Sequence, residues 1–230
     1  MLFLASFSHS ILLLRSAAAQ QVFTLAAYLP GSPLDGLAVN AGGQSFYLGG
    51  SPSYYCPSFI GKYCPNTTTT VFTPGLGALD VSLSSTPTIK DDADCVVQVE
   101  VPGGQIVYTA QNGLLGFTQA HSAYVPAGAY YGGFQNMTIV SDCSAPVVVL
   151  NWASAASGKH FYEAREFADT NVIVEGLLAC PYMISGQPST TVQQIYIDTP
   201  EFNKTGCTKL HGLLPTYLPN GSPPGAWQYI

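Results

Sequence analysis

The chain has 230 residues, and 47% of them are hydrophobic, which is enough to bury a substantial core. Only 9% of the residues are charged, against about 25% in typical soluble proteins. With seven Lys and Arg in all and a net charge of −6, the composition excludes long solvated helices and the basic surfaces that bind nucleic acid or anionic membranes.

The first residues predict a secretory signal peptide. They combine an apolar stretch with three consecutive alanines immediately before Gln20, although Arg15 interrupts the end of the apolar region. The alternative is a disordered apolar N-terminus. We expect a signal peptide over residues 1–19 and a single all-β secreted domain over residues 20–230. No other window is apolar enough to span a membrane.

Turn residues divide the N-terminal third into short predicted strands. Gly and Pro clusters separate three extended runs, at Phe23–Tyr28, Leu37–Asn40 and Ser45–Leu48. Two later runs rich in β-branched or alternating apolar residues, at Thr67–Phe72 and Leu79–Leu83, predict further strands.

Six cysteines without a metal-ligand pattern predict a disulfide framework in an exported chain. Cys56 and Cys64 lie in one irregular loop, each followed by proline, and their spacing is wrong for a zinc knuckle. A disulfide between them would close a short ring and contribute about 2–3 kcal/mol.

A polar loop over residues 84–94 carries Asp91, Asp92 and Asp94. Carboxylates are ligands that calcium accepts, but the glycine and the bidentate glutamate of a calcium loop are missing. A solvated acidic loop is the favoured interpretation.

The centre of the chain predicts a three-stranded antiparallel meander. Valines alternate from Val97 to Val101 as in a half-buried strand, and the Pro-Gly-Gly at 102–104 ends it. The dipeptide Asn112-Gly113 favours a type I′ hairpin turn, so Leu114–Gln119 should fold back on Gln105–Ala110. This register would bury Leu115 and Phe117.

The C-terminal half continues the pattern of short strands, at Val147–Leu150, Val172–Val174, Leu177–Ala179 and Val192–Ile197. Phe161–Ala168 is the one candidate helix, and it fits a strand equally well. We therefore predict an all-β fold, an antiparallel sandwich or barrel-like sheet stapled by disulfides, with little or no helix. A β-trefoil-like arrangement is the alternative.

Few residues suggest catalysis. His121 and Ser122 are adjacent, but no nucleophile elbow surrounds them, and a structural histidine is the favoured interpretation. Glu163, Glu166 and Asp169 could supply the paired carboxylates of a glycosidase, although carboxylates in a polar segment are usually only solvated. We expect no enzymatic activity, no metal and no cofactor.

Aromatic residues in Gly- and Pro-rich segments suggest a binding surface, since flat rings with polar edges can stack on sugars or anchor a protein interface. The alternative is that they cover the ends of the β core. The candidate binding aromatics are Tyr54, Tyr55, Tyr124, Tyr130 and Tyr131, and Tyr63 and Phe134 have similar surroundings.

Four sequons reinforce the secreted interpretation and predict a glycoprotein. The acceptor residues are Asn66, Asn136, Asn203 and Asn220.

Several motifs together resemble one family of fungal secreted proteins, the IgE-binding proteins similar to the phialide cell-wall protein. The most specific is the run from Val99 to Gly128, which contains VEVPGGQ and LGFTQAHSA. The terminal AWQY, the pair Tyr55-Cys56-Pro57 with Cys64-Pro65, and Leu178-Ala179-Cys180-Pro181 also match.

The resemblance implies a secreted or wall-associated protein that interacts with cell-wall polysaccharide or another extracellular protein, with some members acting as antigens or elicitors. A lectin-like module is the alternative, and a glycoside hydrolase is less favoured. The segments 85–94 and 142–169 look longer than the family pattern, and each is accompanied by one cysteine: Cys95 directly follows the first, and Cys143 lies in the second. We therefore expect the disulfides Cys56–Cys64, Cys95–Cys143 and Cys180–Cys207, one of 15 possible connectivities.

Overall fold

A computed structural model describes residues 22–65, 67–74, 97–122, 124–131, 134–141, 144–152, 176–183, 191–219, 222 and 225–230. Within these residues the structure is almost entirely β, with a single 3-10 turn, η1 (Gly61–Tyr63), as its helical element. No helix among them is long and apolar enough to cross a membrane.

The strands are short, and turns separate most of them. In chain order they are β1 (Phe23–Tyr28), β2 (Val39–Gly42), β3 (Ser45–Leu48), β4 (Tyr54–Tyr55), β5 (Phe72–Pro74), β6 (Val97–Val99), β7 (Gln105–Thr109), β8 (Leu115–Phe117), β9 (Tyr130–Tyr131), β10 (Phe134–Ser141), β11 (Ser144–Trp152), β12 (Leu177–Met183), β13 (Thr191–Ile197), β14 (Thr208–Lys209), β15 (Gly212–Tyr217) and β16 (Gln228–Tyr229).

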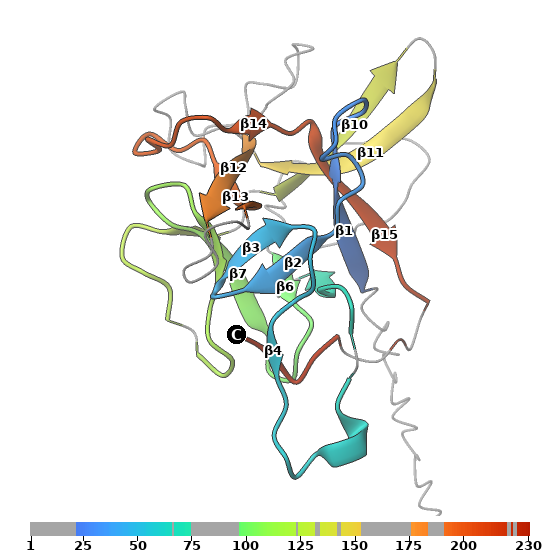
Figure 1. Cartoon of the computed structure of the whole chain (residues 1–230), viewed down its shortest axis with the longest axis vertical. Coiled ribbons are helices and arrows are strands. Elements are labelled where there is room, and N and C mark those ends of the chain that lie inside the picture. The colour runs from blue at the N-terminus through green and yellow to red at the C-terminus, as the bar shows by residue number, and fades with distance from the viewer. Residues whose placement is uncertain are drawn as a thin grey trace, which may run out of the picture.

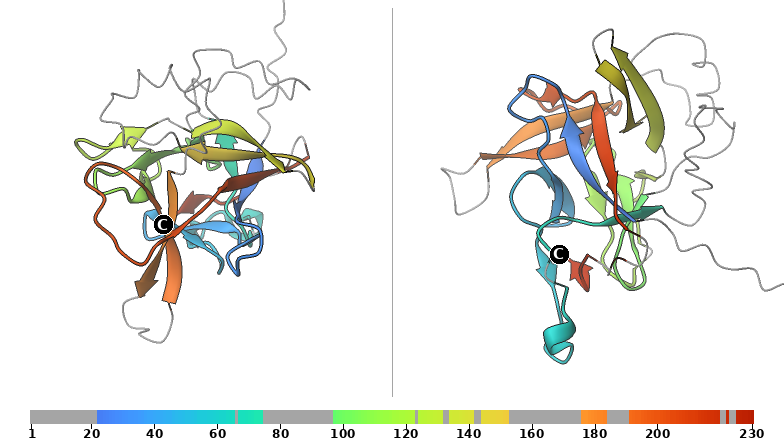
Figure 2. Two further views of the ribbon diagram at one scale, coloured as in Figure 1. Left: turned by 90° about the horizontal axis from the view of Figure 1, so that it is seen from above. Right: turned by 90° about the vertical axis from the view of Figure 1, so that its right-hand side faces the viewer.

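Fourteen of these strands form one antiparallel sheet, which curls into a half-barrel (Figures 1 and 2). The order along it is β10-β11-β15-β1-β5-β6-β7-β8-β3-β13-β12-β14, with β2 beside β3 and β9 beside β7. β4 and β16 form a separate two-stranded ribbon. The predicted all-β, barrel-like, disulfide-stapled class is confirmed.

The core lies inside the curl, where strands from distant parts of the sheet face one another. A chain of aromatic rings crosses it: Phe23 contacts Phe72, Phe72 contacts Phe46, and Phe46 contacts Phe117, with centroid separations of 6.0, 5.7 and 5.2 Å. These rings come from β1, β5, β3 and β8, so the aromatic chain joins the two halves of the sheet. Offset and tilted ring pairs at such distances each contribute about 0.5–1.5 kcal/mol to stability beyond the contribution of their burial.

The predicted central meander is present as β6, β7 and β8, but its turn differs from the prediction. Gly113 has a φ of 86°, Asn112 does not have positive φ, and the Gly113 N–H donates to the Ala110 carbonyl at 2.8 Å. This is a type I turn followed by a left-handed glycine, which makes a three-residue loop rather than a type I′ turn. Leu115 and Phe117 are buried as expected.

The C-terminal strand closes the open side of the core. Tyr229 is only 1% exposed, and its phenol oxygen accepts a hydrogen bond from the Val71 N–H at 3.1 Å. The fully buried side chain of Gln105 donates to the Thr118 and Tyr229 carbonyls and accepts from the Tyr229 N–H. Burial raises the pKa of the Tyr229 phenol to about 12, so this hydroxyl stays neutral at physiological pH.

The predicted strand at Thr67–Phe72 is wrong except for its last residue. The N–H of Thr70 donates to the buried Asn40 side chain at 3.0 Å, and the N–H of Val71 donates to the Tyr229 phenol. Because side chains take these donors, the backbone joins a sheet ladder only from Phe72 onward, in β5.

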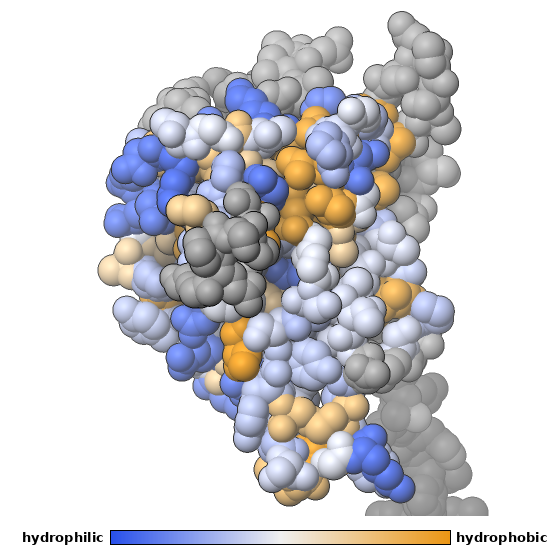
Figure 3. Space-filling view, viewed as in Figure 1, coloured by the Kyte–Doolittle hydropathy of each residue, from blue (hydrophilic) through white to orange (hydrophobic). Residues whose placement is uncertain are grey.

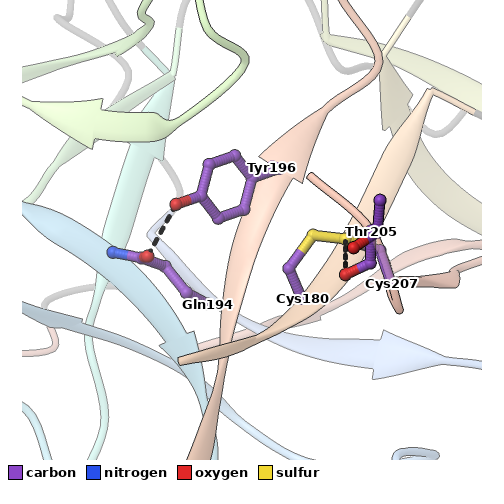
Figure 4. The surroundings of a disulfide bond; sticks show 5 residues. All are labelled: Cys180, Gln194, Tyr196, Thr205 and Cys207. Atoms are coloured by element: carbon purple, nitrogen blue, oxygen red, sulfur yellow. Dashed lines mark hydrogen bonds between the residues drawn. A yellow bond between two sulfur atoms is a disulfide. The ribbon is translucent and has the colours of Figure 1, made fainter. Parts of the chain in front are cut away.

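The structure joins Cys56 to Cys64 and Cys180 to Cys207, two of the three expected pairs. The second bridge ties β12 to the segment that leads into β14, beside a small cluster of Leu178, Cys180 and Tyr196 on the outer side of the sheet. Figure 4 shows this bridge together with Tyr196, whose hydroxyl points away from the bridge and donates to Gln194 Oε1 at 2.9 Å.

Several predictions fall outside the described residues or their described side chains. They are the signal peptide at 1–19, the strands at Leu79–Leu83 and Val172–Val174, the acidic loop with Asp91, Asp92 and Asp94, the third disulfide Cys95–Cys143, the candidate helix Phe161–Ala168 with Glu163 and Glu166, Asp169, the sequon residues Asn66 and Asn220, and the side chains of Asn136 and Tyr131.

Candidate functional site

A hollow of about 260 Å³ opens where β7 and β8 meet the β2–β3 turn and the loop that follows β8. Its walls mix aromatic rings with amide and hydroxyl groups. The described lining residues are Gln44, Tyr108, Phe117, Thr118, Gln119, Ser122, Tyr124 and Pro126.

Tyr108 can lie across one wall of the hollow because the residue paired with it on β8 is Gly116. A Cβ placed on Gly116 would come within 3.1 Å of the Tyr108 ring, so the glycine leaves the space that the ring occupies. Burial, and secondarily the neighbouring Tyr124 phenol, raise the pKa of Tyr108. The Tyr108 phenol therefore remains a neutral hydroxyl that can donate and accept hydrogen bonds.

Gln44 reaches the hollow from a tight β2–β3 hairpin. Gly43 and Gln44, its two loop residues, have φ values of 54° and 56°, the positive values at both positions that define a type I′ turn. The second position of such a turn strongly favours glycine. The turn is held from both sides, since Ser45 Oγ donates to the Gly42 carbonyl at 3.1 Å and the Gly43 N–H donates to the Ile230 carbonyl at 2.8 Å.

His121 occupies a second turn at the rim of the hollow. The Ser122 N–H donates to the Gln119 carbonyl at 3.1 Å, and His121 has a φ of 59° at the third position of this turn. A type II turn requires positive φ there and normally uses glycine. The imidazole lies against the Gly103 turn, because a Cβ on Gly103 would be 2.9 Å from His121 Nδ1.

Gln44 and His121 are the two non-glycine residues with positive φ in the described part of the chain. Gln44 lines the hollow, and His121 lies in the turn between two lining residues, Gln119 and Ser122. A left-handed conformation costs a residue other than glycine about 1–2 kcal/mol. Backbone strain of this kind concentrates at functional sites, because there the function of the side chain compensates for the lost stability. The coincidence identifies the hollow as the candidate site.

Gln44→Gly is expected to raise the free energy of unfolding by about 0.5–1 kcal/mol, because relief of the left-handed strain exceeds the extra chain entropy of glycine. Urea denaturation would measure the change. Gln44→Ala, which keeps the strain, is the control and should not stabilise the protein. If Gln44→Gly proved less stable than the parent, the side chain would be serving the fold rather than the hollow.

The described lining residues carry no charge. Rings that expose a flat face bind apolar faces of ligands, while amides and hydroxyls pair with ligand hydroxyl or amide groups. With a net charge of −6 on the whole chain, the hollow suits a neutral, hydroxyl-rich ligand better than an anion.

The structure separates the five candidate aromatics. Tyr124, 74% exposed, lines the hollow, whereas Tyr54 and Tyr130 are half-buried and pack against the core. Tyr55 is exposed on a different projection, and the backbone of Tyr131 pairs with Tyr108. Phe134, which the sequence suggested to lie in a loop, is a buried residue of β10.

The described hydrogen bonds of the adjacent pair His121 and Ser122 are local turn contacts. Ser122 Oγ accepts a hydrogen bond from the Tyr124 N–H at 3.1 Å, which stabilises the local turn. No group of three His, Cys, Asp or Glu side chains that could hold a metal occurs in the described residues.

Sequence reasoning missed Gln44, Tyr108 and Gln119, because each lies in an ordinary strand or turn context and only the fold brings them together. The Gly42-Gly43-Gln44 turn was a usable signal, since a hairpin that short requires positive φ at Gln44. Of the sequon residues, Asn203 lies on the exposed surface, where a glycan could be accommodated.

Comparison with known proteins found one clear relative. The chain is 31% identical over 201 residues to a protein described as an uncharacterized secreted protein of Arthroderma benhamiae, and the alignment covers 85% of this chain and 79% of that protein. No protein-family model matches the chain, and no solved structure matches it.

Proposed function

The chain belongs to the same family of fungal secreted proteins as this Arthroderma benhamiae protein, and from that premise we propose that it is an extracellular protein that binds a neutral polysaccharide of the cell wall without cleaving it. The hollow beside β7 and β8 is the binding site. The resemblance of the central motif to wall-associated fungal proteins supports a location in the cell wall.

The observation that carries this proposal is an uncharged hollow with two positive-φ residues beside it: Gln44 in its lining, and His121 in the turn between the lining residues Gln119 and Ser122. Tyr124 and Tyr108 would offer ring faces to a sugar, and the Gln44 and Gln119 amides would pair with its hydroxyls. Hydrolysis of a glycosidic bond needs two carboxyl groups about 5–9.5 Å apart. None of the described lining residues is a carboxylate, which supports binding without catalysis.

Tyr124→Ala is expected to weaken binding of a soluble neutral oligosaccharide at least about 10-fold, because it removes an exposed ring wall of the hollow. The probes are hexasaccharides of β-1,3-glucose, mannose and N-acetylglucosamine, measured by calorimetry, with product analysis to detect cleavage. Gln44→Gly should weaken the same binding while stabilising the fold.

Met183→Ala is the control, since Met183 is 66% exposed but lies outside the hollow. It should leave the hexasaccharide affinity unchanged. Loss of affinity in both variants, or in neither, would contradict the hollow as the site, and release of shorter sugars would contradict a non-catalytic role.

A further inference from the structure

A second exposed aromatic surface lies on the loop between the two local cysteines. We call residues 55–64 the aromatic tip. Phe59 is 80% exposed, Tyr63 77% and Tyr55 50%, which are unusually open positions for large rings. The tip projects from the lower end of the body, and apolar atoms gather there (Figures 1 and 3).

The tip is held in shape by several local contacts. The Cys56–Cys64 disulfide closes the loop, η1 fills its far end, and the Ile60 N–H donates to the Pro57 carbonyl at 3.0 Å. The Phe59 ring meets the Trp227 ring edge to face, with centroids 6.3 Å apart. Rings ordered before binding lose less entropy when a partner covers them, so the tip is suited to recognition.

The tip and the hollow share one structural support. β4, at the base of the tip, pairs with β16, and the next residue after β16, Ile230, accepts a hydrogen bond from the Gly43 N–H at 2.8 Å. Gly43 directly precedes Gln44, which lines the hollow. The two surfaces are therefore joined by a short, hydrogen-bonded path rather than by a free linker.

Like the hollow, the tip presents aromatic rings and carries little charge. Its sequence contains Lys62 as its one charged residue, and the Lys62 ammonium lies 5.3 Å from the Tyr63 ring centroid. A single cation on a chain of net charge −6 gives little attraction to anionic lipids. Exposed rings with little charge favour contact with an uncharged, hydroxyl-rich surface.

We propose that the aromatic tip is a second contact for the same neutral polysaccharide, so that the protein engages a polymer at two points. This inference rests on the proposed function of the hollow. Once the hollow has bound, the tip is held close to the same polymer, which gives it a high effective concentration there. The tip therefore strengthens retention on a long or particulate polysaccharide. A hexasaccharide that occupies only the hollow gains nothing from the tip.

The test compares the full-length protein with the double variant Phe59→Ala/Tyr63→Ala on particulate β-1,3-glucan and chitin and on their soluble hexasaccharides. The double variant is expected to lose about 10-fold in affinity for the particles and none for the hexasaccharide. Met183→Ala, which removes a side chain 66% exposed outside the tip, is the control and should change neither. Equal thermal midpoints show that all variants are folded.

The possible results separate the tip from the hollow. Unchanged particle retention in the double variant, with Tyr124→Ala still losing hexasaccharide affinity, overturns the tip contact and leaves the hollow intact. No hexasaccharide binding by the parent overturns both proposals. Tip-dependent binding to neutral phosphatidylcholine vesicles, or tip-dependent self-association in light scattering, without particle retention assigns the tip to another partner and also overturns the inference.

Discussion

Gly113→Val is expected to lower the free energy of unfolding by about 3–6 kcal/mol, a large part of the 5–15 kcal/mol typical of a domain. A Cβ on Gly113 would lie 2.2 Å from the Ile197 carbonyl oxygen, and the residue has a φ of 86°. The Ile197 N–H also donates to the Gly113 carbonyl at 2.7 Å, so the collision would break this link between the hairpin and β13. Urea denaturation would measure the loss.

Gly31→Val is the matched control for backbone strain alone. Gly31 has a φ of 84°, but a Cβ there would meet nothing within 4 Å. Its substitution should cost only the left-handed penalty of about 1–2 kcal/mol. If the two variants lost equal stability, the close approach of the hairpin to β13 would not be an organising contact of the fold.

Tyr229→Ala is expected to destabilise the protein by about 3–5 kcal/mol, since it removes a fully enclosed ring. It would also remove the phenol oxygen that accepts a hydrogen bond from the Val71 N–H at 3.1 Å. Gly225 shows how closely this ring is surrounded, because a Cβ there would lie 2.4 Å from the Tyr229 hydroxyl. The midpoint of urea unfolding should fall accordingly.

Ile230→Ala tests whether the effect belongs to the Tyr229 side chain. Ile230 is 45% exposed and makes its hydrogen bonds through the backbone. Its truncation should change stability by less than about 0.5 kcal/mol. Equal losses in the two variants would contradict a specific contribution of the buried Tyr229 ring.

Local patterns were sufficient to predict much of the sheet. β1 and β3 lie where alternation and turn residues place them, and the β7–β8 hairpin buries the expected residues. β15 was missed because it contains Pro215, which sequence reasoning treats as a strand breaker. Pro215 pairs with Leu25 of β1 in the structure, so the tertiary pairing outweighs the local preference.

The candidate site was much less predictable than the fold. Tyr124 is recognisable as an aromatic residue in a loop, but its neighbours Gln44 and Tyr108 come from distant segments. Their convergence depends on long-range pairing, including the contact of Ser45 with Gly116 between β3 and β8. The positive φ of His121 was likewise not predictable, since histidine is not a residue type typical of left-handed turns.

An NMR titration of the purified protein with a soluble neutral wall hexasaccharide would test the central claim most directly. Saturable amide shifts should cluster at Gln44, Gln119, Ser122 and Tyr124, around the hollow, and should disappear in Tyr124→Ala. Absence of saturable shifts with glucan, mannan and chitin hexasaccharides, or shifts confined to residues outside the hollow, would contradict it.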